Sequence, residues 1–233
     1  MLQVKNLAAS YGAAPVLRGV SLDVEPGSVT AVIGVNGSGK STLLRAISGL
    51  VPKVAGEVIL DGVSVARKKP HEMARLGVAH CLEGRRVFPF MTVLENLEIA
   101  GYGSKAPIEE GLHKAFELFP ILKQRKKIAA GKLSGGELQM LCVAQTLVKD
   151  CRYILIDELT AGVSPLVSQS MGQVVKELSR SGIGILWAEQ NAEVALEWSD
   201  FCFLLQLGEV VLHGKSEDLM ADDLVKREYL GIS

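Results

Sequence analysis

The sequence predicts an α/β protein whose core is a largely parallel sheet. Short apolar runs alternate with longer segments of helical pattern, as they do in proteins built on parallel sheets. Three runs are apolar almost throughout, which is typical of strands covered on both faces: Val29–Ile33, Tyr153–Ile156 and Ile183–Ala188. Polar or glycine-rich residues follow each run at once. Because open parallel sheets bind ligands beyond the carboxyl ends of their strands, functional residues are expected at these three ends.

The N-terminal part of the chain has a different pattern. Apolar runs at Leu2–Leu7 and Val20–Val24 are separated by turn residues. Val58–Leu60, followed by Asp61-Gly62, is typical of a hairpin. These runs predict a small antiparallel sheet beside the parallel one.

The middle of the chain, residues 84–150, is predicted to be mostly helical. Thr92 with Glu95 and Ser134 with Glu137 have capping-box spacing ahead of helical patterns. Pro107 suits the first position of a further helix, which is expected to run through Phe119. We predict a single domain, 1–233, in which a helical subdomain (84–150) is inserted into an α/β core (1–83 and 151–233).

Composition places the chain among ordinary globular proteins and excludes several classes. Its 233 residues are 48% hydrophobic and 22% charged, with a formal net charge of −1, so nucleic acid is not an expected partner. No signal-peptide pattern opens the chain, and its apolar runs are far shorter than the ~20 residues of a spanning helix. The four cysteines lack metal or redox spacing, which favours a reducing compartment.

The strongest chemical signal lies between Gly34 and Ser41. These residues match the P-loop pattern G-x-x-x-x-G-K-[ST], directly after a predicted buried strand and before a helical pattern. Backbone N–H groups of such a loop close around phosphates, and the positive end of the next helix faces them. Lys40 is expected to reach the β- and γ-phosphates, and Ser41 to coordinate Mg²⁺. The alternative is a glycine-rich turn without a ligand. The predicted binding residues are Gly34, Asn36, Gly37, Ser38, Gly39, Lys40, Ser41 and Thr42.

Asp157 and Glu158 directly follow a second predicted buried strand. In a P-loop protein an aspartate at this place is expected to hold Mg²⁺. Two adjacent carboxylates repel each other, so each needs a favourable partner. A metal ion for Asp157 and an attacking water for Glu158 would supply those partners. The predicted fold is therefore an α/β P-loop NTPase core, with a small N-terminal antiparallel sheet and an inserted helical subdomain.

A third motif, Leu133–Glu137, reads LSGGE. Chemically it is a second phosphate cradle, made of Ser134 and the amides of Gly135 and Gly136 at a helix start. A purely structural alternative is the capping box between Ser134 and Glu137. With this motif the sequence resembles the ATP-binding subunits of ABC transporters, whose signature is LSGGQ or LSGGE. The resemblance extends over nearly the whole chain.

Within that family the sequence is most similar to the branched-chain amino acid type, which includes urea and amide uptake systems. Three segments carry this similarity: Leu82–Pro89, Trp187–Asn191 and Tyr229–Gly231. The resemblance implies a peripheral protein on the cytoplasmic face of the cell membrane that hydrolyses ATP with Mg²⁺. It also implies membrane permease subunits as partners, a second ATP-binding subunit in a homodimer or heterodimer, and an indirect link to a solute-binding protein. The implied solute is a branched-chain amino acid or a related small amide- or urea-type molecule.

The resemblance also assigns roles by position. Tyr11 aligns with the aromatic residue that stacks on adenine, and Glu83 stands at the Q-loop glutamine, near the metal. Gln190 stands where most relatives have the switch histidine. Without the family, Tyr11 would be taken as a turn residue and Gln190 as a surface polar residue. The implied catalytic residues are Lys40, Glu83, Glu158 and Gln190, and the implied metal ligands are Ser41, Asp157 and Glu83.

The sequence departs from the family pattern at several positions. Leu82 and Leu159 replace usual prolines, Leu138 a glutamine and Gln145 an arginine, and Gly162–Pro165 lacks a common aspartate. These changes leave the phosphate, metal and base positions intact and bear on the hydrolysis rate. A nonhydrolysing or weakly hydrolysing partner in a heterodimer therefore stays as the alternative. The chain has a single P-loop and no room for a coiled coil, which disfavours an ABC-type ATPase of DNA repair or translation. It has no Asn-Lys-x-Asp motif, which disfavours a GTPase.

The apolar run Val87–Met91 lies in a stretch that otherwise has a loop pattern. Exposed apolar patches often mark partner sites. The permease is therefore predicted to dock near Leu82–Met91, between the helical subdomain and the core. Burial of this run within the subunit is the alternative.

Overall fold

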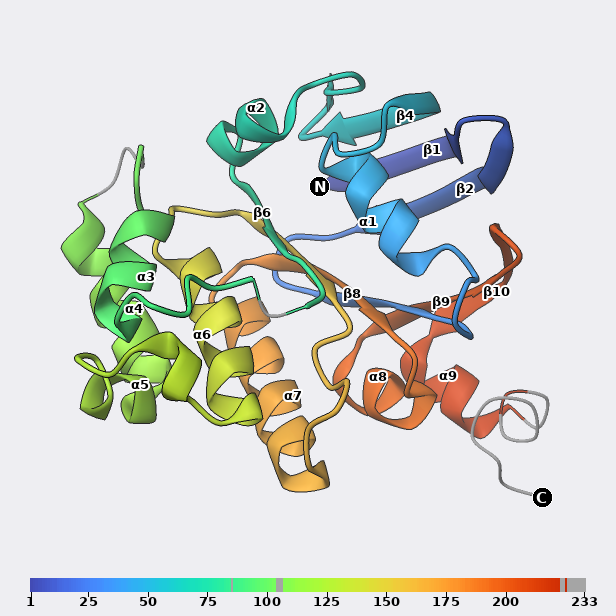
Figure 1. The fold of residues 1–233 in the computed structure, drawn as a ribbon. Helices are drawn as coiled ribbons and strands as arrows, with labels where there is room; N and C mark the ends of the chain where they lie inside the picture. Colours follow the sequence, from blue (N-terminus) through green and yellow to red (C-terminus); the bar gives the residue numbers. More distant parts are fainter. Residues whose placement is uncertain (85, 104–106, 223–224, 226–233) are drawn as a thin grey trace.

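The computed structural model describes residues 1–84, 86–103, 107–222 and 225, and it contains two sheets (Figure 1). The antiparallel sheet has the strand order β2-β1-β4-β5. Its strands are β1 (Leu2–Tyr11), β2 (Ala14–Val24), β4 (Lys53–Leu60) and β5 (Val63–Ser64). The order in the other sheet is β10-β9-β3-β8-β7-β6. Its strands are β3 (Val29–Ile33), β6 (Val78–Cys81), β7 (Tyr153–Asp157), β8 (Gly184–Glu189), β9 (Phe201–Gln206) and β10 (Glu209–Lys215).

The second sheet is parallel except at one edge, where β10 pairs antiparallel with β9. The α/β class, the antiparallel sheet and the three buried strands predicted from the sequence are confirmed. Every residue of β3, β7 and β8 is buried. The antiparallel strands run further than the sequence predicted, since β1 continues to Tyr11 and β2 begins at Ala14.

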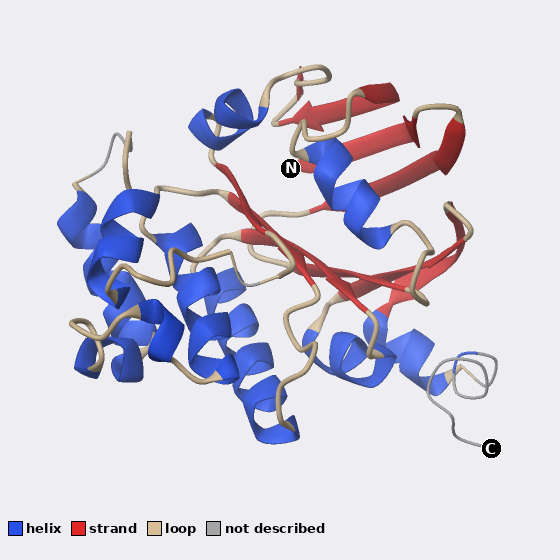
Figure 2. Cartoon of the chain, viewed as in Figure 1, coloured by secondary structure: helices blue, strands red, loops and turns tan. Residues whose placement is uncertain are grey.

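Helices lie on both sides of the parallel sheet, as Figure 2 shows. They are α1 (Lys40–Ile47), α2 (Pro70–Arg75), α3 (Val93–Ala100), α4 (Ile108–Leu118), α5 (Pro120–Gln124), the 3₁₀ turn η1 (Ala130–Lys132), α6 (Gly135–Leu147), α7 (Pro165–Arg180), α8 (Ala192–Trp198) and α9 (Ser216–Ala221). The capping boxes at Thr92 and Ser134 are confirmed as the starts of α3 and α6. None of the helices in the described part of the chain has the length and apolar character that a bilayer crossing requires.

Successive residues of the central strands face different cores, because side chains alternate along a strand. Leu155 packs into the core around α1, between the two sheets. Its neighbours Ile154 and Ile156 pack into the core shared with α3, α6 and α7. The sheet is thus covered on both faces, and its carboxyl edge is left for the loops that follow β3, β7 and β8.

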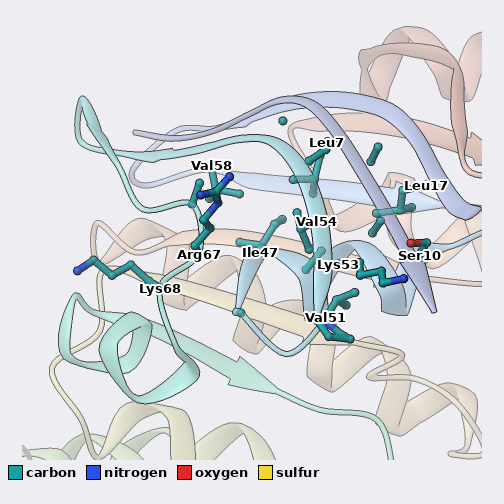
Figure 3. Close-up of a pocket in the computed structure, with 18 of the residues that line it drawn as sticks. Leu7, Ser10, Leu17, Ile47, Val51, Lys53, Val54, Val58, Arg67 and Lys68 are labelled. Carbon is teal, nitrogen blue, oxygen red and sulfur yellow. The ribbon is translucent and has the colours of Figure 1, made fainter. Parts of the chain in front are cut away.

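A cavity of about 930 Å³ lies beneath the antiparallel sheet, close to the end of α1 (Figure 3). Buried apolar side chains form much of its wall: Leu7, Leu17, Ile47, Val51 and Val58. Arg67 and Lys68 lie at its rim, and Lys68 points away from the apolar wall toward Glu72, to which its Nζ donates at 3.2 Å. The cavity contains none of the motif residues.

Candidate nucleotide and metal site

The P-loop connects β3 to α1, and its glycines are required by the geometry. Gly37 and Gly39 have φ angles of 80° and 112°, in the region that favours glycine. A Cβ at Gly34 would lie 2.3 Å from the carbonyl oxygen of Leu205, so no larger residue fits there. A Cβ at Gly37 would meet nothing within 4 Å, which leaves open space above the loop. The loop therefore has the shape of a backbone cradle at the N-terminus of a helix.

Lys40 is the first residue of α1, and its side chain is buried inside this cradle. Its Nζ donates to the carbonyl oxygen of Gly34 at 2.8 Å and to that of Val35 at 3.4 Å. The same Nζ lies 3.6 Å from Oε1 of Glu158. Charged acceptors make shorter and stronger hydrogen bonds than neutral carbonyls do. A phosphate in the cradle is thus a better acceptor for this ammonium than the two carbonyl groups.

Ser41 and Asp157 meet beside the cradle. The Ser41 Oγ donates to Oδ1 of Asp157 at 2.9 Å, whereas Oδ2 of Asp157 is buried and has no hydrogen-bond partner. Burial raises the pKa of Asp157; the Ser41 hydrogen bond and Arg45 oppose the rise, while Glu83 and Glu158 add to it. The buried Ser38 Oγ also has no partner. Unpartnered hard oxygens of this kind fit Mg²⁺, which commonly takes one or two carboxylates together with phosphates and water.

Glu158 is placed by a sharp turn at the end of β7. Its φ of 50° is uncommon for a residue other than glycine. Its backbone N–H donates to the carbonyl oxygen of Ala188 at 2.9 Å, which fixes the turn against β8. The carboxylate therefore lies next to Lys40, one residue beyond the Asp157 carboxylate.

A cleft of about 620 Å³ opens between the segments that follow β7 and β8. Glu158, Thr160, Glu189 and Gln190 are among the residues that line it. Gln190 is exposed, whereas Glu189 is buried and accepts hydrogen bonds from Thr160 and Gln190. The sequence motifs identified Glu158 and Gln190 but missed Glu189. A carboxylate at the end of an otherwise apolar run was the signal that could have found it.

Tyr11 and Glu83 lie at the margins of this region. Tyr11 ends β1, and its side chain is 44% exposed. The partner strand of the same hairpin reaches the P-loop, because a Cβ at Gly39 would come within 2.9 Å of the Leu17 side chain. Glu83 is exposed after β6, yet its charge contributes to the raised pKa of Asp157.

The Ser134 cradle lies elsewhere in the chain. Ser134 caps α6: its Oγ accepts from the N–H of Glu137 at 3.3 Å, and its own N–H donates to Oε2 of Glu137 at 2.8 Å. Figure 1 shows α6 well apart from the loop that leads into α1. The structure thus brings together Lys40, Ser41, Asp157 and Glu158, and it does not bring the Ser134 cradle to them.

Comparison with known proteins agrees with this geometry. A probable branched-chain amino acid transport ATP-binding protein of Archaeoglobus fulgidus is 36% identical, over 99% of this chain and 95% of its own length. A high-affinity branched-chain amino acid transport ATP-binding protein of Pseudomonas aeruginosa is 34% identical, over 99% of this chain and all of its own length (100%). The lipopolysaccharide export system ATP-binding protein of Escherichia coli is 31% identical, over 99% and 97%.

Among solved structures, the ADP conformation of an ATP-binding cassette of an ABC transporter superposes with a TM-score of 0.86 at 29% identity, covering 99% of this chain and 98% of that one. A nucleotide-free ATP-binding cassette gives a TM-score of 0.86 at 27% identity, with the same coverage of 99% and 98%. The profile of the ABC transporter family matches residues 17–161. The P-loop, the paired carboxylates and the full-length similarity lead to one conclusion: the chain belongs to the ABC transporter family.

Proposed function

We propose that this chain binds and hydrolyses ATP with Mg²⁺ and thereby drives a separate membrane permease. The observation that best supports hydrolysis is the cluster at the carboxyl edge of the sheet. There Lys40 lies 3.6 Å from Glu158, and Ser41 bonds one oxygen of Asp157 while the other, buried oxygen has no partner. Binding alone does not need a carboxylate at position 158, whereas activation of a water molecule does.

Each residue of the cluster has a separate task in this proposal. Lys40 would leave the carbonyls of Gly34 and Val35 for the β- and γ-phosphates, while Ser41 and Asp157 would hold Mg²⁺, with Glu83 nearby. Bound Mg²⁺ supplies positive charge that offsets the charge developing on the phosphates. Glu158 orients the attacking water and receives its proton. Gln190 donates to the γ-phosphate, and Tyr11 stacks on adenine.

We propose further that two ATP-binding subunits pair head to tail around the nucleotide. Ser134, Gly135 and Gly136 form a second set of donors at a helix start, and the distance between α6 and the P-loop in Figure 1 argues that they serve the nucleotide of a different subunit. In this arrangement the chain lies on the cytoplasmic face of the membrane, next to the permease. The helical unit 84–150 would then carry the cradle and, together with the end of the core at Leu82, the permease contact.

The proposed solute is a branched-chain amino acid or a related small amide- or urea-type molecule. Two of the similar proteins are named for branched-chain amino acid transport, at 36% and 34% identity. A solute-binding protein is the expected indirect partner. The relative from a lipopolysaccharide export system, at 31% identity, shows that similar ATP-binding subunits serve very different solutes.

Lys40→Ala tests the proposed activity directly. Turnover should nearly vanish, because loss of one preorganised charge-stabilising donor costs about 3–4 kcal/mol of transition-state stabilisation. Steady-state ATPase rates of the purified wild type, of Lys40→Ala and of the exposed control Lys127→Ala are the measurement. Wild-type turnover in Lys40→Ala would contradict the proposal. A wild type that binds ATP without turnover would favour the alternative, a nonhydrolysing partner subunit.

The pairing of subunits is tested with Glu158→Gln. This variant should hydrolyse ATP slowly. It should accumulate as a dimer in MgATP, because the dimer around the nucleotide separates only after hydrolysis. Size measurement with and without nucleotide decides the matter. A monomer at every protein concentration would argue against self-pairing.

A further inference from the structure

Glu189, at the end of β8, carries a buried carboxylate that none of the sequence motifs explains. Among the described residues three charged side chains are buried, and two of them, Lys40 and Asp157, belong to the nucleotide site. Glu189 is the third, at 2% exposure, and no ion pair formed within the described part of the chain includes it. A buried anion without a cation is costly unless hydrogen bonds satisfy it.

Four donors surround this carboxylate. Its Oε1 accepts from the backbone N–H of Thr160 at 2.8 Å and from the indole Nε1 of Trp187 at 3.1 Å. Its Oε2 accepts from the Thr160 hydroxyl at 3.1 Å and from the backbone N–H of Gln190 at 3.3 Å. Burial raises the pKa of Glu189, and these hydrogen bonds act against the rise. Both oxygens are therefore fully occupied, and Trp187 holds the group in one orientation.

Three of the donated bonds come from two separate loops that both belong to the proposed active site, and the fourth comes from Trp187 in β8 itself. Thr160 is two residues beyond Glu158, and Gln190 is the residue next to Glu189. In the sheet, Asp157 pairs with Ala188, and Glu189 pairs with Ile33, the residue before the P-loop. The carboxylate thus lies between the strand that leads to the metal ligand and the strand that leads to the phosphate cradle.

The backbone conformation at Glu158 gives a reason for hydrogen bonds that connect these two loops. Its φ of 50° places it in a sparsely populated region, which persists only when the surrounding structure holds it. The bond from its N–H to Ala188 fixes one side of the turn. The two bonds from Thr160 to Glu189 fix the other side.

We propose that Glu189 is a positioning residue that ties the Glu158 loop to the Gln190 loop. The tie keeps the carboxylate that orients water and the amide that contacts the γ-phosphate at a fixed separation. This inference rests on the proposed ATPase function and adds to it a residue that touches neither nucleotide nor metal.

The isosteric substitution Glu189→Gln separates this role from simple packing. The glutamine oxygen can take the place of Oε1 and accept both of its donors. Its NH₂ group then occupies the Oε2 position, where the Thr160 hydroxyl can turn to accept but the N–H of Gln190 cannot. The substitution therefore leaves the Gln190 backbone without an acceptor. Thr160→Val removes only the hydroxyl donor, and Thr160→Ser keeps it.

We expect Glu189→Gln to lower kcat about tenfold or more, the size of effect that an unsatisfied buried donor produces, while ATP affinity changes less than about twofold. Thr160→Val should lower kcat less, and Thr160→Ser should restore it. The matched control is Glu177→Gln, which makes the same change on the exposed side of α7 and should behave as wild type. A double variant of Glu189→Gln with Gln190→Ala should be no slower than Gln190→Ala alone, because both act through one interaction.

Hydrogen exchange in the absence of nucleotide measures the tie independently of turnover. The Gln190 amide should exchange about tenfold faster in Glu189→Gln than in wild type, since its acceptor is lost. Wild-type kcat in Glu189→Gln, or additive losses in the double variant, would overturn the positioning role. If Glu189→Gln does not fold, Thr160→Val with unchanged kcat and unchanged exchange of the backbone amide at position 160 overturns it equally. A wild type that hydrolyses no ATP, with the exchange result as expected, would refute the proposed function and leave the tie between the loops supported.

Discussion

At the scale of single residues, Gln190 makes the proposed active site different from one with a switch histidine. An amide side chain donates and accepts hydrogen bonds but gains no proton near neutral pH, whereas histidine does. We expect Gln190→Ala to lower kcat strongly with little change in ATP affinity, because the P-loop supplies most of the ground-state binding. Gln190→His should keep activity and introduce a pH dependence between about 6 and 7. Rates and ATP affinities of both variants across that range are the measurement. A wild-type rate in Gln190→Ala would show that Gln190 is an ordinary surface residue without a role in hydrolysis.

His80 is expected to make the folding stability sensitive to acid. Its Nδ1 lies 2.9 Å from Oγ of Ser48, and its buried Nε2 has no partner. Burial, together with the charges of Arg45 and Arg86, lowers the pKa of His80 to about 4. Between pH 6.5 and about 4 the unfolded chain therefore binds a proton at this position that the folded chain excludes. Stability should fall as the pH falls through this window, by on the order of 3 kcal/mol from this group.

The measurement is the free energy of urea unfolding at several pH values for wild type, His80→Gln and His113→Gln. His80→Gln should flatten the profile between pH 6.5 and 4. His113 lies on an exposed helix face, with 73% of its side chain accessible, and serves as the control. An unchanged slope in His80→Gln would show that other groups produce the acid response.

The chemistry of the candidate site was largely predictable from the sequence, since its residues lie in contiguous motifs. Gly34–Ser41 form one contiguous motif, and Asp157 and Glu158 are neighbours in the chain. Glu189 was not predictable in the same way. Trp187 and Gln190 are near Glu189 in the chain, but Thr160 reaches it only because β7 and β8 pair in one register, and no local pattern records that register.

At the scale of elements, the chain contains two helix starts of nearly identical geometry. Thr92 and Ser134 both have φ −65° and ψ 164°, and each forms a complete capping box with a glutamate at the third helical position. Thr92→Ala and Ser134→Ala should therefore each lower the free energy of unfolding by about 1 kcal/mol. Only Ser134→Ala should also reduce ATP turnover, because only Ser134 belongs to the proposed second cradle. Urea unfolding and ATPase assays on both variants test this. Equal losses of turnover would mean that Ser134 serves only as a helix cap.

The elements that the sequence predicted are those with strong local signals. The three buried strands β3, β7 and β8 and the helices with capping boxes were found, with boundaries within a few residues. β9 was missed although most of its residues are apolar and buried, and β6 and β10 were missed for physical reasons. β6 has four residues and includes His80, and β10 alternates partly buried and exposed residues at the sheet edge. Their strand identity depends on pairing with β7 and β9, which is tertiary information.

At the scale of the whole molecule, a groove lies between the core and the helices that follow β6. It has a volume of about 400 Å³, and Leu82 and Arg86 lie on its wall together with Met73 and Gln145. Nearby, Phe90 is 98% exposed, an unusual environment for phenylalanine. These features support the proposal that the permease docks at Leu82–Met91.

Cysteine cross-linking tests this placement in membranes that contain the assembled transporter. Phe90→Cys should cross-link to a cytoplasmic loop of the permease. The control Val63→Cys, on the exposed strand β5, should not. Cross-linking from Val63→Cys together with none from Phe90→Cys would place the permease on the antiparallel sheet instead.

The turn at Glu158 also limits how this protein can be redesigned. Glycine reaches a φ of 50° without the steric cost that glutamate bears there, so the backbone conformation alone would favour glycine at that position. A procedure that ranks substitutions by thermostability should therefore select a change that removes the proposed catalytic base. If Glu158 is the proposed catalytic base, glutamate at this position gives up local stability for chemistry. Thermostabilised variants of this chain should keep that residue fixed and seek their gains away from the carboxyl edge of the sheet.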